Sequence, residues 1–277
     1  MLYLHLGFHK TASTHFQEML NATFSNDERF MYVGPSAFRK FTKWKRGGQF
    51  DMDYSEAYLK NISSMTENLI LSEENLCGHT FDIFKHDRLY ENIFSRLSSL
   101  SEFFNAFEDI EIFLSIRDPI THLPSMYCEA LRWRPYRTFH LIYHGNYYQS
   151  WIPVIEDIIK ALPSSIINVM LYEHYREDLP TILKMMGGTA SVALETEKVI
   201  RPSFVSRSIK MMGLIACFIP KRFHRKILSL LDLFLRRIDL ENFQPFNQGE
   251  IEVLSKQYLK DIEKLSQMEN INIISRF

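Results

Sequence analysis

The most informative stretch of this sequence is Met1–Gln17, MLYLHLGFHKTASTHFQ. Leu2–Leu6 is a short apolar run with the composition of a buried strand, and Gly7 supplies a turn signal directly after it. Apolar residues then recur at helical spacing from Phe16 onward. The stretch therefore predicts a strand, a tight loop and a helix in direct succession.

The predicted loop, Gly7–Thr14, is rich in groups that bind oxyanions. A helix N-terminus presents unpaired N–H groups and a partial positive charge, and the Ser13 and Thr14 hydroxyls add donors. Gly7 allows a close approach of the backbone, and Lys10 adds a mobile positive charge. The pattern predicts an oxyanion-binding loop, with a plain surface turn capped by Ser13 or Thr14 as the alternative.

Further apolar runs alternate with segments of helical periodicity along the chain. Strands are predicted over Phe30–Val33, Leu69–Leu71, Ile110–Ile116 and Ile166–Tyr172. Helices are predicted over about 13–24, 54–67, 89–107, 119–132, 146–162, 173–186, 221–237 and 250–267. This alternation predicts an α/β fold: a P-loop-NTPase-like, doubly wound parallel sheet flanked by helices, with a helical C-terminal elaboration. No repeat or linker interrupts it, so we expect residues 1–277 to form a single domain.

Composition and charge exclude several classes of function. With 46% hydrophobic and 23% charged residues, the chain has the make-up of an ordinary globular protein. A formal net charge of −1 gives no global basis for nucleic-acid binding. The longest apolar runs, near Met211–Pro220 and Ile227–Leu235, are too short to span a membrane. Three widely spaced cysteines and the lack of a secretory signal predict a cytoplasmic protein with reduced thiols.

A second cluster of polar residues follows the predicted strand Ile110–Ile116. Arg117 stands at the carboxyl end of this strand, and Pro119 suits the first position of the helix that follows. Ser125 lies about two turns further along that helix. A strand-end guanidinium and a helix hydroxyl can converge on one phosphate, so this segment predicts a second anion site.

Two carboxylates follow the predicted strand Leu69–Leu71. In a parallel sheet the carboxyl ends of the strands face the ligand crevice, so Glu73 and Glu74 are candidates for a general base or for acceptor binding. We expect Glu73 rather than Glu74 to be the base. The alternative is structural: Ser72 would cap the next helix and the two carboxylates would complement its dipole.

The two anion-binding motifs together resemble those of sulfotransferases. Gly7–Thr14, G-F-H-K-T-A-S-T, resembles the 5′-phosphosulfate loop of that family, G-x-x-K-[ST]-G-[ST]-[ST]. Arg117, Pro119, Ser125 and Tyr127 match the 3′-phosphate motif R-x-P-x₅-S-x-Y with the same spacing. In the nucleotide triphosphate P-loop, G-x-x-x-x-G-K-[ST], the Lys is placed differently. The chain is therefore similar to the bacterial, carbohydrate-type branch of the sulfotransferases.

The resemblance implies a donor, a mechanism and a set of contacts. The donor would be 3′-phosphoadenosine-5′-phosphosulfate (PAPS), and no metal would be required. Lys10 would stabilise charge on the leaving phosphate, and Glu73 would take the proton of an acceptor hydroxyl or, as the second choice, an amine. The implied cofactor contacts are Gly7, Lys10, Thr11, Ala12, Ser13 and Thr14 at the 5′ end, and Arg117 and Ser125 at the 3′-phosphate.

The sequence departs from the family pattern at several positions. Ala12 replaces the usual Gly, which we expect to be a mild change if the backbone there is helical. His15 stands where enzymes of the phenol and steroid branch often have Trp, which argues against that branch. Arg201 takes the place of Asn in an Asn-x-Ser-x-x-Ser-like stretch of the bacterial enzymes, and Arg207 nearby is expected to reach the nucleotide.

Basic segments suggest what the acceptor and the surroundings are. The basic, aromatic regions Arg39–Arg46 and Arg132–Arg137 favour a glycan, a glycolipid or another small-molecule acceptor. The alternatives are a solvated loop or short amphipathic helix for the first region and a solvated helix end for the second. Residues 221–237 set basic side chains around an apolar stripe. This helix either lies on an anionic membrane, which would make the protein peripheral at the inner membrane face, or packs on the core with a solvated outer face. The sequence contains no signal for the oligomeric state.

Two other functions remain open. A P-loop-type kinase would use Glu73 as a Walker-B-like acid at the end of a hydrophobic strand. A non-catalytic protein that binds glycans or membrane surfaces would keep the fold and bind nucleotide without turnover.

Overall fold

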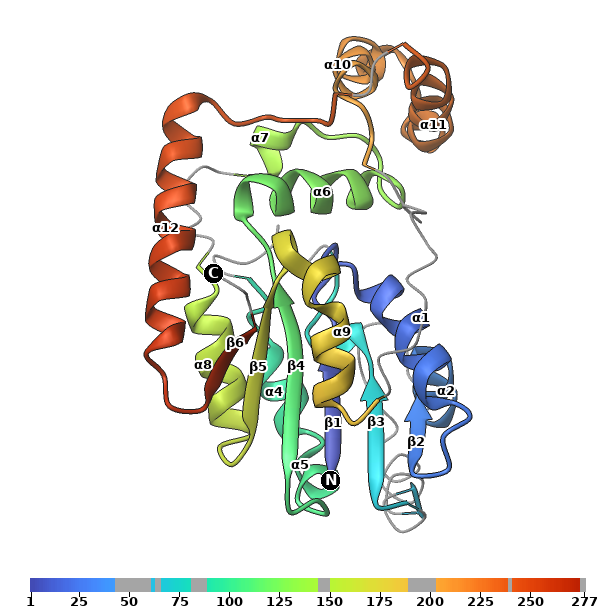
Figure 1. The fold of residues 1–277 in the computed structure, drawn as a ribbon. Coiled ribbons are helices and arrows are strands. Elements are labelled where there is room, and N and C mark those ends of the chain that lie inside the picture. The colour runs from blue at the N-terminus through green and yellow to red at the C-terminus, as the bar shows by residue number, and fades with distance from the viewer. Residues whose placement is uncertain are drawn as a thin grey trace.

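A sheet of six parallel strands forms the centre of the computed structural model, with the order β2-β3-β1-β4-β5-β6 (Figure 1). The structure describes residues 1–42, 61–62, 66–80, 89–143, 150–188, 203–238 and 241–274. The strands are β1 Leu2–Leu6, β2 Phe30–Val33, β3 Asn68–Ser72, β4 Ile110–Ile116, β5 Ile166–Leu171 and β6 Ile271–Ile274. The predicted α/β fold with a parallel sheet between helices is confirmed.

Helices cover both faces of the sheet. The α-helices are α1 Ser13–Phe24, α2 Pro35–Phe41, α4 Ile93–Ser98, α5 Ser101–Phe104, α6 Pro119–Leu131, α7 Phe139–Ile142, α8 Ile152–Ala161, α9 Tyr175–Met185, α10 Ser206–Ile215, α11 His224–Leu235 and α12 Gln248–Ser266. Short 3₁₀ turns are η1 Glu74–Leu76, η3 Tyr172–His174, η4 Ala216–Phe218 and η5 Lys221–Phe223.

Side chains of the strands alternate between two apolar clusters. In β1, Leu2, Leu4 and Leu6 belong to the cluster that also contains residues of α4, α8 and α12. Tyr3 packs against the opposite cluster, which is formed with α1 and α9. Because both faces are shielded from water, the strands are continuous apolar runs in the sequence rather than alternating ones.

The order of the strands places a crevice beside β1. From β1 the chain runs to β2 and β3 on one side of the sheet, while β4, β5 and β6 extend the other side. β1 and β4 are direct neighbours, with Leu6 opposite Leu114 in the register. Ligands of open parallel sheets bind where the strand order reverses, outside the carboxyl ends. The loop after β1 and the segment after β4 therefore meet at one site.

Most predicted elements are confirmed, and two differ. The single helix predicted over 89–107 is wrong, because the chain forms the short helices α4 and α5 with a turn between them. At this turn the Ser99 hydroxyl donates to the Arg96 carbonyl at 2.7 Å, a type of bond that competes with helix continuation. The helix predicted over 146–162 starts at Ile152, where the Ser150 hydroxyl accepts the backbone N–H at 3.2 Å.

Some predictions fall on parts of the chain that the structure does not describe. Residues 144–149 and most of the helix predicted over 54–67 lie outside the described residues. β6, in contrast, was not predicted, because a run of four residues gives a weak periodic signal.

The C-terminal elaboration contains a helical hairpin. α10 and α11 pack against each other and lie beyond α6, at the carboxyl end of the sheet (Figure 1). α12 then returns along the β6 side of the sheet, starting at a capping box between Asn247 and Glu250. This arrangement agrees with the predicted helical elaboration.

Candidate active site

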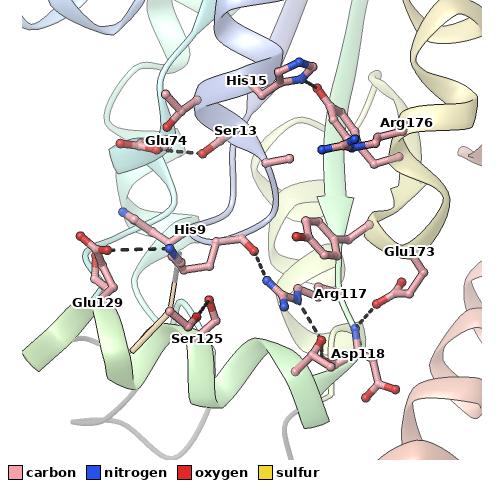
Figure 2. A pocket seen from close by; sticks show the side chains of 18 of the residues that line it. His9, Ser13, His15, Glu74, Arg117, Asp118, Ser125, Glu129, Glu173 and Arg176 are labelled. Carbon is pink, nitrogen blue, oxygen red and sulfur yellow. Dashed lines mark hydrogen bonds and ion pairs between the residues drawn. The ribbon is translucent and has the colours of Figure 1, made fainter. Parts of the chain in front are cut away.

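A cavity of about 940 Å³ opens at the carboxyl ends of the strands (Figure 2). Its walls come from the loop after β1, the turn after β3, the helix α6 and the segment that joins β5 to α9. The residues next to the hairpin, Ser203 and Asn242, complete the lining. Sites for drug-sized ligands span about 300–1,000 Å³, so the cavity has room for a ligand of nucleotide size.

Helix α1 points its N-terminus at this cavity. Ser13, Thr14 and His15 form its first turn and line the cavity. The N-cap residue, Ala12, makes no side-chain capping bond, so the positive end of the helix faces the cavity. A Cβ on Gly7 would lie 2.7 Å from the Cβ of Ser13, so glycine is needed for this close packing. The loop has the geometry of an anion-binding helix end.

The backbone of the loop departs from the sequence-based expectation at Ala12. Both Lys10 and Ala12 have φ of 63°, in the left-handed region. The expectation that Ala in place of Gly is mild depended on a helical backbone at Ala12, and this condition is not met. A non-glycine residue in this region costs about 1–2 kcal/mol. Ala12 stores strain at the start of α1 that glycine would relieve.

Lys10 extends into the cavity beside a carboxylate. Its side chain is only 16% exposed, and its Nζ lies 3.8 Å from Oε2 of Glu129. Burial lowers the pKa of Lys10, while the charge of Glu129 acts in the opposite direction. The ammonium is therefore partly desolvated, which strengthens its interaction with any anion in the cavity.

Arg117 is held in place by three contacts. Its Nη1 donates to the main-chain carbonyl of Lys10 at 2.8 Å, and its Nε donates to the Thr121 hydroxyl at 2.9 Å. The guanidinium also lies over the Tyr172 ring, 4.2 Å from the centroid. Burial lowers the pKa of Arg117, but a guanidinium keeps its charge in proteins. The group has five N–H donors, so donors remain for a bound anion.

The helix α6 presents a polar stripe to the cavity. Thr121, Ser125 and Glu129 follow one another at four-residue spacing and all line the cavity. The Ser125 hydroxyl is buried and lies 3.3 Å from the hydroxyl of Ser203. The structure thus brings Ser125 and Arg117 to the same cavity as the α1 loop, as the two motifs predict (Figure 2).

Three residues predicted as cofactor contacts lie elsewhere. Gly7, Thr11 and Arg207 are not among the described residues that line the cavity. The Thr11 hydroxyl donates to the Phe8 carbonyl at 2.6 Å, so it fixes the shape of the loop. Arg207 is exposed on α10. The direct cofactor contacts expected from these three residues remain predictions. Gly7 and Thr11 instead stabilise the conformation of the loop.

Glu73, the predicted base, is turned away from the cavity. It is fully buried and pairs with Arg39, whose Nε and Nη2 donate to its two oxygens at 2.7 and 2.6 Å. Its Oε1 also accepts the N–H of Asn75 at 2.8 Å and caps η1. Burial raises the pKa of Glu73, and Arg39 opposes this. The structural alternative was a cap on the following helix by Ser72. The cap is made by Glu73 instead, and the Ser72 hydroxyl hydrogen-bonds to His5 at 2.7 Å.

Glu74, in contrast, faces the cavity. Its Oε2 accepts the Ser13 hydroxyl at 3.0 Å, and its Oε1 lies 3.7 Å from Nη2 of Arg39. Figure 2 shows Glu74 and Ser13 pointing toward each other. Of the two neighbouring carboxylates, Glu74 is the one that a substrate in the cavity can reach. The base role predicted for Glu73 remains untested.

Sequence reasoning missed several residues of the cavity. Glu129 accepts the indole N–H of Trp133 at 3.2 Å and lies 3.6 Å from Arg132. Its position four residues after Ser125, on the same helix face, is the signal that could have identified it. Glu173, which follows β5, accepts the Asp118 N–H at 2.9 Å. Five more lining residues come from the η3–α9 segment: Tyr172, His174, Tyr175, Arg176 and Glu177.

No group of three or more His, Cys, Asp or Glu side chains in the described part of the chain is arranged to hold a metal ion. The expectation that no metal is required stays an expectation.

Comparison with known proteins gives little guidance. No family model matches the sequence, and no curated protein matches it. One solved structure, a sulfotransferase from Alicyclobacillus acidocaldarius, is similar at a TM-score of 0.42 and 11% identity, covering 83% of this chain and 95% of that one. A similarity of this size does not establish a shared activity.

Proposed function

We propose that this protein is a sulfotransferase that moves a sulfuryl group from PAPS to an acceptor hydroxyl, with an amine as the second choice of acceptor. The hydrogen bond from Arg117 Nη1 to the Lys10 carbonyl is the observation that carries the proposal. It joins the two segments that resemble the family's anion-binding motifs at the wall of one cavity.

The groups around the cavity suit a donor with two anionic ends. The N-terminus of α1, the hydroxyls of Ser13 and Thr14, and the Lys10 ammonium would hold the 5′-phosphosulfate. Arg117 and Ser125 would hold the 3′-phosphate, the Arg by its fork of donors. When bound, PAPS would supply an activated sulfuryl group attached to its 5′-phosphate.

Lys10 would act by charge stabilisation. Transfer of such a group relies mainly on positioning and on charges placed before the reaction begins. Glu129 and the buried surroundings fix the ammonium where it can oppose negative charge at the 5′ end of the donor. Lys10 has a left-handed backbone, and its carbonyl accepts the hydrogen bond from Arg117. One turn of the chain would therefore fix the positions of both the Lys10 ammonium and the Arg117 guanidinium.

We assign to Glu74 the role of the base that takes the proton from the acceptor. Five described carboxylates line the cavity: Glu74, Asp118, Glu129, Glu173 and Glu177. Glu74 and Glu129 contact the segment that would hold the 5′ end of the donor, through Ser13 and Lys10. Glu129 already lies between Lys10 and Arg132, so protonating it would weaken the charge that holds Lys10. Glu74 accepts a hydroxyl hydrogen bond from Ser13 and is 26% exposed, so it can take a proton from a hydroxyl in the cavity.

The acceptor would bind at the rim of the cavity near Trp133. The indole is 56% exposed and lines the cavity, which offers an apolar platform of the kind that a sugar ring covers. Arg132 and its basic neighbours lie beside it. The other basic region, Arg39–Arg46, is described only as far as residue 42, and Arg39 is engaged with Glu73.

Sulfuryl transfer can be tested with labelled donor. Purified protein is incubated with [³⁵S]PAPS and a panel of glycans and glycolipids, alongside the Lys10→Ala variant. Labelled product from the wild type, lost in the variant, supports the proposal. Phosphoryl transfer from ATP in place of sulfuryl transfer would assign the cavity to a kinase, and nucleotide binding without any turnover would indicate a non-catalytic binding protein.

A further inference from the structure

The α10–α11 hairpin, residues 206–238, exposes large apolar side chains to solvent. It carries eight of the fifteen exposed large apolar side chains among the described residues, so this surface is concentrated rather than scattered. Phe218 is 85% exposed, Leu214 75% and Phe234 63%. The full set is Met211, Leu214, Phe218, Phe223, Leu230, Leu233, Phe234 and Ile238.

These side chains are not on the face that packs on the protein. In α11, His224, Leu228 and Asp232 form the buried stripe at four-residue spacing. Leu230 and Phe234 lie on the opposite side of the same helix and are exposed. One face of α11 therefore packs inward, while its outer face exposes apolar side chains next to polar and basic ones.

The same hairpin is strongly basic. Residues 206–238 contain eight Lys and Arg residues and one acid, Asp232, although the whole chain has a net charge of −1. Asp232 is buried and pairs with Arg236 at 2.8 Å. The positive residues are Arg207, Lys210, Lys221, Arg222, Arg225, Lys226, Arg236 and Arg237.

A shallow hollow on the hairpin combines both properties. It has a volume of about 370 Å³ and is lined by Arg132, Arg236 and Arg237 together with Leu233, Phe204, Ser229 and Asp232. The Asp232 carboxylate is paired with Arg236. The guanidinium groups of Arg132 and Arg237 beside the exposed Leu233 match a phosphate that sits above acyl chains.

We propose that the α10–α11 hairpin is a docking surface for an anionic lipid membrane. Its Phe and Leu side chains would enter the boundary between headgroups and acyl chains, and its Lys and Arg side chains would contact lipid phosphates. No helix in the described ranges is long and apolar enough to cross a membrane.

The charge of the hairpin favours a lipid surface over a second copy of the chain. A symmetric dimer through this face would bring two surfaces with the same positive excess together. Like charges across an interface oppose association, whereas anionic headgroups neutralise them. Each basic residue near such a membrane adds to the attraction.

The hairpin is joined to the candidate active site. Arg225 of α11 lies over the ring of Trp133, 5.8 Å from its centroid, and Trp133 lines the cavity. Ser203 and Asn242, on either side of the hairpin in the sequence, line the cavity as well. Docking would bring the cavity close to the lipid surface. If the protein has the proposed function, the acceptor would be carried by a lipid; this inference about the acceptor rests on that function.

Vesicle flotation tests the docking surface. The full chain is floated with vesicles of phosphatidylcholine alone and of phosphatidylcholine mixed with phosphatidylglycerol. We expect flotation only with the anionic vesicles, and partial release at high salt. The double variant Phe218→Ser with Phe234→Ser should lower the partition coefficient about tenfold or more. Lys226→Glu with Arg237→Glu should do the same through charge.

A matched control separates docking from general loss of apolar surface. Val253 and Leu259 are exposed on α12, at 53% and 65%, and their change to Ser should leave flotation unchanged. Absence of flotation with anionic vesicles, or an equal loss in the α12 variant, would overturn the inference. So would a wild-type dimer in solution that the Phe218/Phe234 variant dissociates, since it would assign the face to a second copy.

Binding of adenosine 3′,5′-bisphosphate is measured on the same protein preparations. Nucleotide binding without flotation would refute the membrane inference alone. Flotation without nucleotide binding would refute the proposed function alone. The Phe218/Phe234 variant should bind the nucleotide as the wild type does, which also shows that it is folded.

Discussion

Arg117 donates from Nη1 to the main-chain carbonyl of Lys10 at 2.8 Å, although 107 positions separate the two residues in the sequence. The contact exists because β1 and β4 are neighbours in the sheet, so the segments that follow them meet. It makes the position of one cation depend on the backbone that carries the other. Under the proposed function, this coupling would make the two anion sites act as one site for a donor with two anionic ends.

Removing the Lys10 charge should abolish transfer while sparing binding at the 3′ end. We expect Lys10→Ala to lower kcat about 100- to 1,000-fold, the usual cost of losing one prearranged group that stabilises the transition state. Bisphosphate binding should remain measurable, because Arg117 contacts the main chain of Lys10 and not its side chain. Lys160→Ala, at an exposed lysine on α8, serves as the control. Full transfer activity in Lys10→Ala would refute the role of this lysine.

The two neighbouring glutamates should respond differently to substitution. Glu74→Gln should lower kcat about 100-fold or more and leave stability near that of the wild type, since Glu74 faces the cavity.

Glu73→Gln should instead destabilise the fold by about 2 kcal/mol, because it breaks the pair of buried Glu73 with Arg39. We expect less than a fully buried pair would lose, since the Arg39 side chain is 36% exposed. Urea unfolding and steady-state kinetics measure the two effects. Normal stability with lost turnover in Glu73→Gln would restore Glu73 as the base.

Ala12→Gly should stabilise the protein. The left-handed backbone at Ala12 costs about 1–2 kcal/mol for alanine, and glycine would remove this cost. Part of the gain in stability is lost because glycine has more conformational freedom in the unfolded chain. We expect a net gain of about 0.5–1 kcal/mol in the free energy of unfolding. Chemical denaturation measures it, with Ala161→Gly at the end of α8 as a right-handed control that should lose stability. A loss of stability in Ala12→Gly would show that the backbone at Ala12 is not strained.

The pH profile should report the charge on Lys10. Burial lowers the pKa of Lys10, and the Glu129 carboxylate raises it. Transfer needs the protonated ammonium, so kcat/KM should fall as the pH rises through this lowered pKa. Glu129→Gln removes the group that favours protonation, so the alkaline limb should move to lower pH. A limb that stays in place would mean that another group controls it.

Local sequence patterns were sufficient to predict the strands and the helix that carry the site. β1, α1 and β4 have the predicted boundaries, because each strand is an apolar run that a turn or a charged residue ends. Since the carboxyl ends of parallel strands share one edge of a sheet, the positions of Lys10 and Arg117 at strand ends were enough to bring the two motifs together.

Side-chain direction at the site was not predictable from local patterns. Whether Glu73 or Glu74 faces the cavity depends on Arg39, which arrives from α2 and takes Glu73 as its partner. The left-handed backbone at Ala12 leaves no trace in hydrophobic periodicity, and a family pattern with Gly at that position is the only hint. Both features are set by contacts between segments far apart in the chain.

Calorimetric titration with adenosine 3′,5′-bisphosphate measures whether the two anion sites bind one donor. We expect tight binding by the wild type, loss of that binding in Arg117→Ala, and unchanged binding in Arg134→Ala, at an exposed arginine beyond α6. ATP with Mg²⁺, titrated in parallel, should bind weakly or not at all. Binding of ATP–Mg²⁺ alone, or of neither nucleotide, would refute the proposed donor site.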